Sequence, residues 1–293
     1  MRLACIGSVT VDSISKNGRT IKAPGGTSFF AALALAALRD SATIITSHGD
    51  DWKPFRDQLS SYGVEVVNLN PMGNTAIFKI DYDEKGRRLA LSRPATPLEL
   101  EPSELREYDG VILGPVAREL SKEFTSSAIS SGIRTAVGIQ GYVRGFDADG
   151  RVHLERTDLS FLKGSFLIAG SSTEFRAALG NARMALGVGS RYVLISRGRA
   201  GATLYGTSKY HAKSSGNGSD PTGAGDVLLA SAFHNLVSGM KEEDAVTRAA
   251  ALASASAHGS GLQKFELIRK AAFPRPSTLP CIMFNLLYLS QPR

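Results

Sequence analysis

The chain has 293 residues, of which 43% are hydrophobic and 21% are charged, with 30 glycines. This composition excludes a disordered chain, and the length suits a single α/β domain over residues 1–293. The net charge of +7 comes from 34 Lys and Arg residues against 27 Asp and Glu residues. No basic run is interleaved with aromatic residues, so we expect a solvated basic surface and no nucleic-acid partner.

The ends of the chain give expectations about location. Cys5 lies in the apolar stretch RLACIG and is predicted to be a buried thiol, while Cys281 is far away in the sequence. The N-terminal stretch lacks the apolar core of a signal peptide, and we expect a reducing, cytoplasmic location. The apolar stretch 281–289 is too short to span a bilayer. It is interpreted as an edge strand or a subunit contact, and no membrane partner is expected.

Short β-rich runs alternate with helical patterns along most of the chain. Strands are predicted at 3–7, 42–47, 64–69, 110–115, 134–139, 165–170 and 191–196. Helices are predicted at 27–40, 52–63, 118–132, 174–187, 224–238 and 241–258. This βαβα order predicts a mainly parallel sheet covered by helices.

Two stretches interrupt this alternation and have the pattern of antiparallel hairpins. In residues 75–93, alternating segments flank a turn that ends at Gly86, and in residues 12–23 the turn is Asn17-Gly18. Asn-Gly between alternating segments is a strong hairpin signal, and Gly86 suits the left-handed backbone of a turn. The two hairpins are predicted either to pair into a small sheet that serves as a lid over a pocket, or to be plain surface hairpins.

The two common nucleotide-binding fingerprints are absent. The stretch GATLYGTS (201–208) has the glycine spacing of a P-loop, but it has threonine where the lysine is required. The first predicted strand is followed by GSVTVD and not by G-x-G-x-x-G. These departures argue against a P-loop enzyme and against a nicotinamide-dependent oxidoreductase.

The stretch SDPTGAGDVLLASAF (219–233) predicts an anion site. Gly223, Ala224 and Gly225 carry almost no side chain, so their backbone N–H groups can approach a ligand closely where a helix begins. The positive end of the helix would favour a phosphoryl group, above all the charge that develops on its oxygens during transfer. Asp226 has two possible roles here: it caps the helix, or it accepts a proton from a hydroxyl group.

The string DPTGAGD followed by VLLASAF resembles the signature of the ribokinase-like (PfkB) carbohydrate kinase family, which includes nucleoside and polyol kinases. The resemblance covers about residues 2–262. It implies a three-layer αβα sandwich with a small β-sheet lid, and it implies ATP and Mg²⁺ as cofactors. It also implies that Asp226 is the catalytic base and that Gly223, Ala224 and Gly225 form the anion hole.

The resemblance assigns further residues to the acceptor side. Gly25 and Gly26 match a Gly-Gly pair that lies against the substrate, where a β-carbon would block approach. Asp12 matches an aspartate that accepts hydrogen bonds from substrate hydroxyls. Phe30 stands where many sugar kinases of the family have asparagine, and its ring can only pack or stack. This departure keeps a nucleoside or inositol kinase open as an alternative.

Two short segments suggest polar groups near the transferred phosphate. GIQGYVR (138–144) resembles a Q-G-x-x-R segment of some members, in which Gln140 or Arg144 would reach a substrate hydroxyl or a phosphate. The family's N-x-x-E motif appears as SSTE, with Ser171 for asparagine and Glu174 retained. Glu174 is expected to orient magnesium through water, because this ion commonly keeps several waters. The alternative for Glu174 is a helix-capping carboxylate.

The resemblance places the nucleotide in the later part of the chain. The expected nucleotide-binding residues are Ser196, Gly198, Gly201 and Thr222. The hypothesis is ATP-dependent phosphorylation of a hydroxyl group on a small sugar, polyol or nucleoside, with a possible homodimer formed through the lid. The alternative from another class is a catalytically inactive nucleotide- or sugar-binding regulator.

Overall fold

The structure is a computed structural model that describes residues 1–16, 18–83, 86–216 and 218–274. The predicted edge strand or subunit contact at 281–289 lies outside these residues, as do Asn17 and part of the turn before Gly86. No helix in the described ranges is long and apolar enough to cross a membrane.

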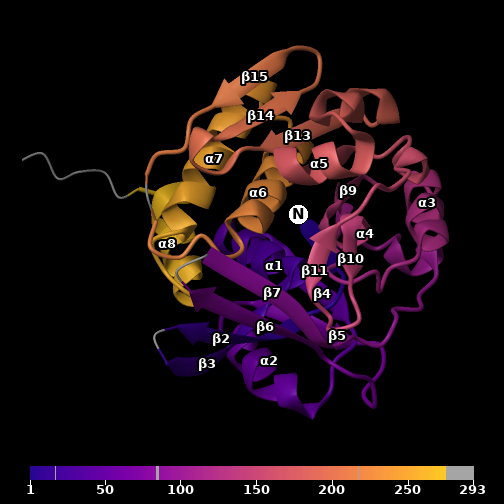
Figure 1. Cartoon of the computed structure of the whole chain (residues 1–293). Helices are drawn as coiled ribbons and strands as arrows, with labels where there is room; N and C mark the ends of the chain where they lie inside the picture. The colour runs from indigo at the N-terminus through magenta and orange to yellow at the C-terminus, as the bar shows by residue number, and fades with distance from the viewer. Residues whose placement is uncertain (17, 84–85, 217, 275–293) are drawn as a thin grey trace, which may run out of the picture.

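In the described residues the main sheet has nine strands, and most pairs of neighbouring strands run parallel (Figure 1). In spatial order they are β15 (Lys209–Ala212), β14 (Ala202–Tyr205), β13 (Tyr192–Ser196), β12 (Leu167–Ser171), β9 (Thr135–Gly138), β8 (Gly110–Leu113), β1 (Arg2–Ile6), β4 (Ser41–Thr46) and β5 (Val64–Asn68). At one edge of the sheet, β14 pairs antiparallel with both β13 and β15. The chain builds outward from β1 to β5 on one side and then from β8 on the other.

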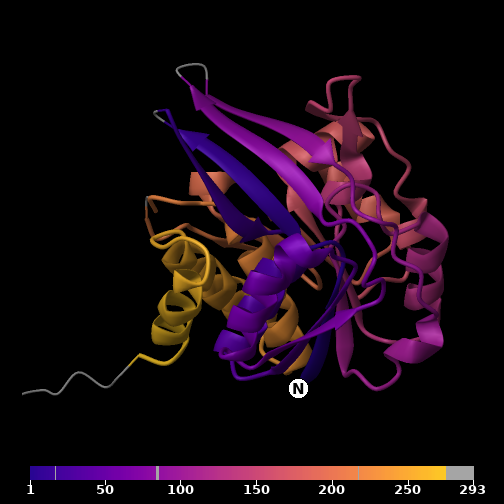
Figure 2. The ribbon, with the colours of Figure 1, turned by 90° about the horizontal axis from the view of Figure 1, so that it is seen from below.

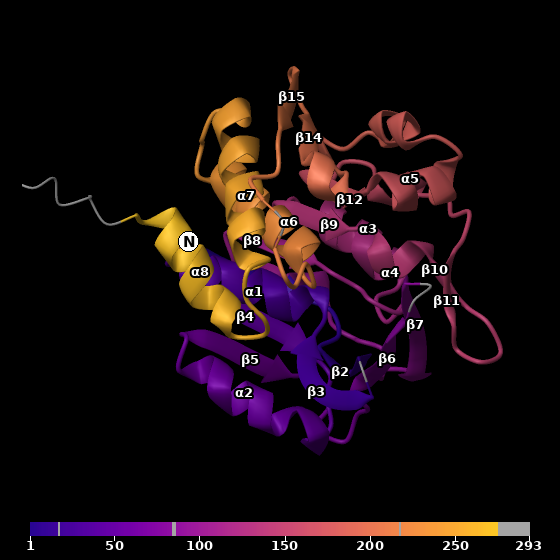
Figure 3. The same ribbon diagram turned by 60° about the vertical axis from the view of Figure 1, so that its left-hand side comes forward.

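Helices cover both faces of this sheet, because successive side chains of a strand point to opposite faces. In β1, Leu3 and Cys5 belong to one apolar cluster, while Ala4 and Ile6 belong to the other. The first face carries α1 (Thr27–Ala37), α2 (Lys53–Ser60), α6 (Ala224–Val237), α7 (Glu242–Ser256) and α8 (Gln263–Ala272). The second carries α3 (Lys122–Ser130) and α5 (Ser172–Leu179). The αβα sandwich is confirmed (Figure 3).

The burial of Cys5 is also confirmed, and desolvation raises the pKa of its thiol. The helix predicted over 174–187 is wrong in its second half. The helix α5 ends at Leu179, because Gly180 takes a left-handed φ of 82° that closes the last turn. Residues 182–188 then continue as a separate 3-10 segment.

The two predicted hairpins pair with each other into a four-stranded sheet, which we call the lid. Its strands, in order, are β3 (Arg19–Gly25), β2 (Thr10–Lys16), β6 (Ala76–Asp83) and β7 (Gly86–Arg93). The hairpins join through parallel pairing of β2 with β6. Figure 2 shows the lid projecting from the body of the molecule as a separate layer. A short hairpin, β10 (Arg144–Phe146) with β11 (Val152–Leu154), follows the single-turn helix α4 (Gln140–Val143).

Candidate active site

The candidate residues gather at the carboxyl ends of the parallel strands, where the strand order reverses between β1 and β8. Asp12 follows β1, Gln140 follows β9, Glu174 follows β12, and Ser196 ends β13. In open α/β sheets, ligands bind in the crevice at this reversal. The sheet therefore brings together residues that are far apart in the sequence.

Asp226 lies in the first turn of α6, between two cavities. One cavity of about 270 Å³ lies under the lid and also includes Asp12. The other, of about 170 Å³, extends toward Glu174. Gly225 lines both of these cavities and also a third one of about 390 Å³. We call them the lid, middle and donor cavities. The N-terminus of α6 is the point at which all three meet.

The carboxyl group of Asp226 has a pKa raised to about 6. The largest cause is desolvation, since the carboxylate is set deep among protein atoms although it contacts the cavities. A hydrogen bond from the Thr27 hydroxyl and the charge of Arg144 oppose this rise, and the negative charges of Glu174 and Asp12 add to it. A carboxylate with a pKa near 6 is a stronger base than an ordinary one and is still ionised at pH 7.

We expect kcat/KM for the acceptor to fall on the acid side with an apparent pKa of about 6, because protonated Asp226 cannot accept a proton. Replacing Thr27 with valine removes a group that stabilises the ionised form, so this limb should move to higher pH. The pH profiles of both proteins, measured with a saturating donor, test this. A limb that stays in place in the Thr27 variant contradicts the assignment to Asp226.

The backbone before Asp226 turns sharply into α6 at Gly223. Gly223 is left-handed, with φ 73° and ψ −2°, and α6 begins at the next residue. A β-carbon on Gly223 would run into the ring of Phe30, which is buried. Phe30 thus packs directly against the loop, a role that its aromatic character did not reveal in the sequence. The Phe30 side chain thus both lines the lid cavity and packs against Gly223.

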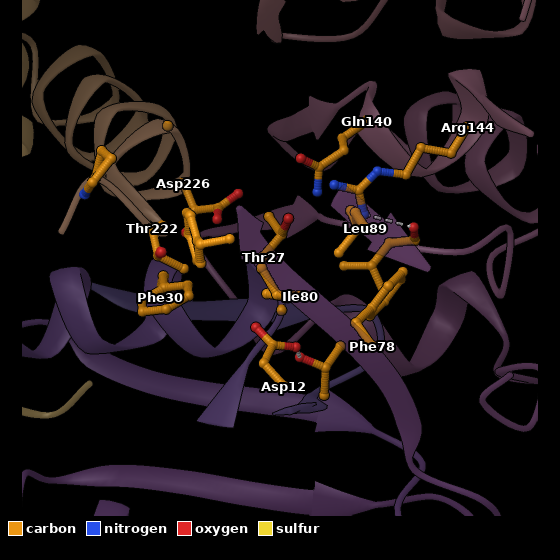
Figure 4. A pocket seen from close by; sticks show the side chains of 17 residues that line it. Asp12, Thr27, Phe30, Phe78, Ile80, Leu89, Gln140, Arg144, Thr222 and Asp226 are labelled. Carbon is orange, nitrogen blue, oxygen red and sulfur yellow. Dashed lines mark hydrogen bonds between the residues drawn. The ribbon is translucent and has the colours of Figure 1, made fainter. Parts of the chain in front are cut away.

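The lid cavity has a polar end at Asp12 (Figure 4). The Thr10 hydroxyl donates to Asp12 Oδ1 at 2.7 Å, which orients the carboxylate. Gly25 faces Thr10 across the β2–β3 ladder, and a β-carbon there would collide with the Asp12 carboxylate. The expectation for the Gly-Gly pair is therefore refined. Gly26 lines the cavity, with φ 96°, whereas Gly25 makes room for Asp12.

Gln140 and Arg144 lie at the opposite end of the lid cavity from Asp12 (Figure 4). The Arg144 Nη1 atom donates to the Val116 carbonyl oxygen at 3.1 Å, and the guanidinium group lies 5.6 Å from the centre of the Phe78 ring. These contacts hold the cation near Asp226, where it lowers the pKa of that carboxyl group. Gln140 also lines the middle cavity, so its amide reaches the junction of the two.

The middle cavity contains the residues expected near magnesium. Ser171 and Glu174 form a capping box: Ser171 N donates to Glu174 Oε2 at 2.7 Å, and Glu174 N donates to Ser171 Oγ at 3.1 Å. Serine therefore replaces the family's asparagine as a helix cap. The described residues include no cluster of three or more metal-ligating side chains. If magnesium binds here, the Glu174 carboxylate would hold it through water, because this ion commonly keeps several waters.

The donor cavity has an apolar wall and a backbone-lined mouth. Ala250, Ala253 and Ala257 of the α7 region form the wall together with Leu228. Ser196, Gly198 and Gly201, the predicted nucleotide-binding residues, also line this cavity. Thr222, which was expected beside the nucleotide, instead lines the lid cavity.

Sequence reasoning missed several residues of the site. Thr27, which bonds Asp226, is the first residue of α1 after the Gly-Gly pair, so its position in the motif was an available signal. The apolar side chains that the lid contributes were not predicted, because alternation within a hairpin does not show which face meets a ligand. The residues missed around the lid cavity are Thr10, Thr27, Phe78, Ile80, Tyr82, Leu89 and Val116.

The family model for "pfkB family carbohydrate kinase" matches residues 2–268, and the chain belongs to this family. It is therefore a phosphotransferase that acts on a hydroxyl group. No curated protein matches the sequence well enough to add a closer relative.

Solved structures with the same fold include kinases that use different donors. A pyrophosphate-dependent kinase in the ribokinase family, complexed with a pyrophosphate analog and myo-inositol, has a TM-score of 0.80 at 22% identity, covering 90% of this chain and 98% of its own. Ribokinase from Thermotoga maritima has a TM-score of 0.72 at 18% identity, with coverages of 92% and 98%. Arabidopsis thaliana ribokinase, complexed with ribose and ATP, has 0.71 at 17%, with coverages of 92% and 98%.

Proposed function

We propose that this chain is an ATP-dependent kinase that phosphorylates a hydroxyl group of a small sugar or polyol, with Asp226 as the base. The observation that carries the proposal is the position of Asp226, at the N-terminus of α6 and between the lid cavity and the middle cavity. An acceptor hydroxyl in the lid cavity can reach this carboxylate, and a phosphoryl group can lie against the adjacent amides. The two reacting groups thus meet at one point.

In the proposed mechanism, Asp12 accepts hydrogen bonds from acceptor hydroxyls and orients the ring. Asp226 then accepts the proton of the attacking hydroxyl as the oxygen bonds to the γ-phosphorus, and the bond to the β-phosphate oxygen breaks. The amides of residues 223–225 donate to the phosphoryl oxygens as charge develops on them. Bound magnesium would supply further charge neutralisation. The lid excludes water, which would otherwise be phosphorylated in place of the acceptor.

Two features of the donor cavity support ATP over pyrophosphate as the donor. Its volume of about 390 Å³ exceeds that of the middle cavity, and its wall of alanines and Leu228 is apolar. A flat heterocycle is stabilised by such a surface, while pyrophosphate has no group that would use it. Pyrophosphate is the second candidate donor, because a relative of known structure is pyrophosphate-dependent.

A larger side chain in the apolar wall of the donor cavity distinguishes ATP from pyrophosphate as the donor. Ala253 of α7 lines the donor cavity, and its replacement by phenylalanine should raise KM for ATP by about 10-fold to 100-fold through steric overlap with the base. Ala251 of the same helix is exposed, so Ala251→Phe is the matched control and should leave KM unchanged. Steady-state kinetics with ATP and with pyrophosphate test this. Equal effects of the two variants would contradict a base in the cavity.

The acceptor side favours a compact polyhydroxylated ring. Asp12 and Gln140 provide hydrogen-bonding groups at the two ends, while Phe78, Ile80 and Leu89 from the lid supply apolar walls for ring carbons. The cavity of about 270 Å³ suits a monosaccharide or an inositol better than a nucleoside. An inositol is the acceptor alternative that Phe30 keeps open, and a relative of known structure binds myo-inositol.

A panel of sugars, cyclic and linear polyols and nucleosides, assayed for acceptor-dependent ADP release, tests the proposal. We expect turnover with one or more members of the sugar and polyol classes and weak turnover with nucleosides. Turnover with nucleosides and with no other class would mean that the acceptor is a nucleoside and not a sugar or polyol. Tight ATP binding without turnover on any member would favour the inactive regulator.

A further inference from the structure

The ammonium group of Lys264 is buried within the protein, beside the loop that opens the DPTGAGD string (220–226). Its side chain lies in α8 and has no exposed surface. The Nζ atom donates to three backbone carbonyl oxygens: Asp220 at 2.9 Å, Ser256 at 2.9 Å and Gly259 at 2.7 Å. Lysine is rarely buried in this way unless its charge is compensated. The burial of this charged group therefore requires an explanation.

The three carbonyl groups come from two separate loops. Asp220 opens the DPTGAGD string, while Ser256 and Gly259 lie where α7 ends. The loops are also joined directly, since Asp220 N donates to the Ala257 carbonyl oxygen at 2.9 Å. Three donated hydrogen bonds require the protonated amine, because a neutral amine has only two N–H groups. Burial lowers the pKa of Lys264, and the nearby Asp220 opposes this shift.

A short chain of contacts leads from Lys264 to the anion hole. The Asp220 side chain accepts a hydrogen bond from Thr222 N at 3.0 Å, through Oδ1. Gly223, the next residue, has the left-handed backbone from which α6 begins. Carbonyl dipoles that converge on one point repel one another unless a cation lies between them. Without the ammonium group, we expect the Asp220 carbonyl to turn away, so that residues 220–223 would no longer be held in one conformation.

We propose that Lys264 is a positioning residue for phosphoryl transfer: its ammonium group is a built-in cation that holds residues 220–223 in the conformation of the anion hole. The proposal rests on the function proposed above for the hole itself. It makes a chemical prediction, because truncating the side chain leaves a cavity surrounded by carbonyl oxygens. Such oxygens bind potassium ions, and ammonium restores the same donors.

The test compares Lys264→Ala with Lys270→Ala, which truncates an exposed lysine of the same helix. Turnover is measured with added ammonium, potassium or tetramethylammonium chloride at equal ionic strength. We expect Lys264→Ala to lower kcat by about 10-fold to 100-fold, with a smaller change in KM for the acceptor. Ammonium or potassium should restore at least part of kcat, tetramethylammonium should not, and Lys270→Ala should respond to none.

Hydrogen exchange at the Thr222 and Ala224 amides separates this proposal from the proposed function, because it requires no acceptor. Faster exchange in Lys264→Ala, reversed by ammonium or potassium, supports the positioning role even if no acceptor is turned over. Unchanged exchange together with unchanged kcat overturns it. Melting temperature is the second readout: recovery of melting temperature by the cations without recovery of kcat or of amide protection would reduce Lys264 to a purely structural residue.

Discussion

Replacing Asp226 with asparagine is expected to lower kcat by about 100-fold to 10,000-fold, while KM for ATP and for the acceptor changes only a few-fold. Asparagine has nearly the same shape and still fits the first turn of α6, but it cannot accept the hydroxyl proton. Steady-state kinetics on the acceptor found by the panel, with dissociation constants from calorimetry, measure both effects. Near wild-type kcat in Asp226→Asn would rule out the base role.

The same substitution distinguishes the base from a helix cap. Because burial raises the pKa of Asp226 from 3.8 to about 6, the folded state binds more protons than the unfolded state between these values. Stability is therefore lost as pH rises from about 4 to about 6, and the loss persists above it. Asparagine has no charge to bury, so Asp226→Asn should be as stable as the wild type at pH 7, or more stable by about 1–2 kcal/mol after allowance for solvent screening.

Asp244 supplies the control for this comparison. It is an exposed carboxylate in the first turn of α7, where it interacts with the helix dipole. Asp244→Asn should cost about 0.3–1 kcal/mol and leave kcat unchanged. A loss of melting temperature in Asp226→Asn that equals the loss in Asp244→Asn, with kcat retained, would return Asp226 to the capping interpretation.

Replacing Gly223 with alanine is the second change with a large expected effect. The added β-carbon lies in a left-handed conformation and runs into the Phe30 ring, so the loop must move. Because the amides of residues 223–225 form the proposed hole, we expect kcat to fall by about 100-fold to 1,000-fold. The loss should exceed any change in KM for the acceptor, since the hole acts mainly on charge that develops during transfer.

Gly239 controls for the backbone cost alone. It has a similar φ of 81°, lies after α6, and has open space where its β-carbon would lie. Gly239→Ala should cost about 1–2 kcal/mol of stability and leave kcat unchanged. Thermal unfolding and kinetics on both variants separate the effects. If Gly223→Ala loses only this much stability and retains kcat, the loop does not form the hole.

Short local motifs in the sequence were enough to predict the anion site and the hairpins. DPTGAGD indicated an anion site with a carboxylate beside it, and Asn17-Gly18 and Gly86 indicated the hairpins that form the lid. These predictions depend on backbone conformations that only particular residues adopt, so short strings suffice. The helix predicted over 174–187 is wrong for a related reason, since its helical pattern runs through Gly180 although this residue caps the helix.

Long-range contacts could not be predicted from such strings. The packing of Phe30 beneath Gly223 joins residues almost two hundred positions apart, and the pattern around Phe30 gives only a buried helix. Thr222 lies in a string with cavities on both sides, so sequence could not choose between them. Lys264 has no motif at all, because its partners are backbone carbonyl groups, and every residue has one.

The central claim is direct transfer of a phosphoryl group from ATP to an acceptor hydroxyl at Asp226. The measurement that tests it most directly follows the label of γ-³²P-ATP in a single turnover with the acceptor and excess enzyme. We predict that the label appears in a phosphate ester of the acceptor and that Asp226→Asn slows this step while ATP still binds. Label that appears only as inorganic phosphate, or that stays in ATP while both ligands are bound, would contradict the account.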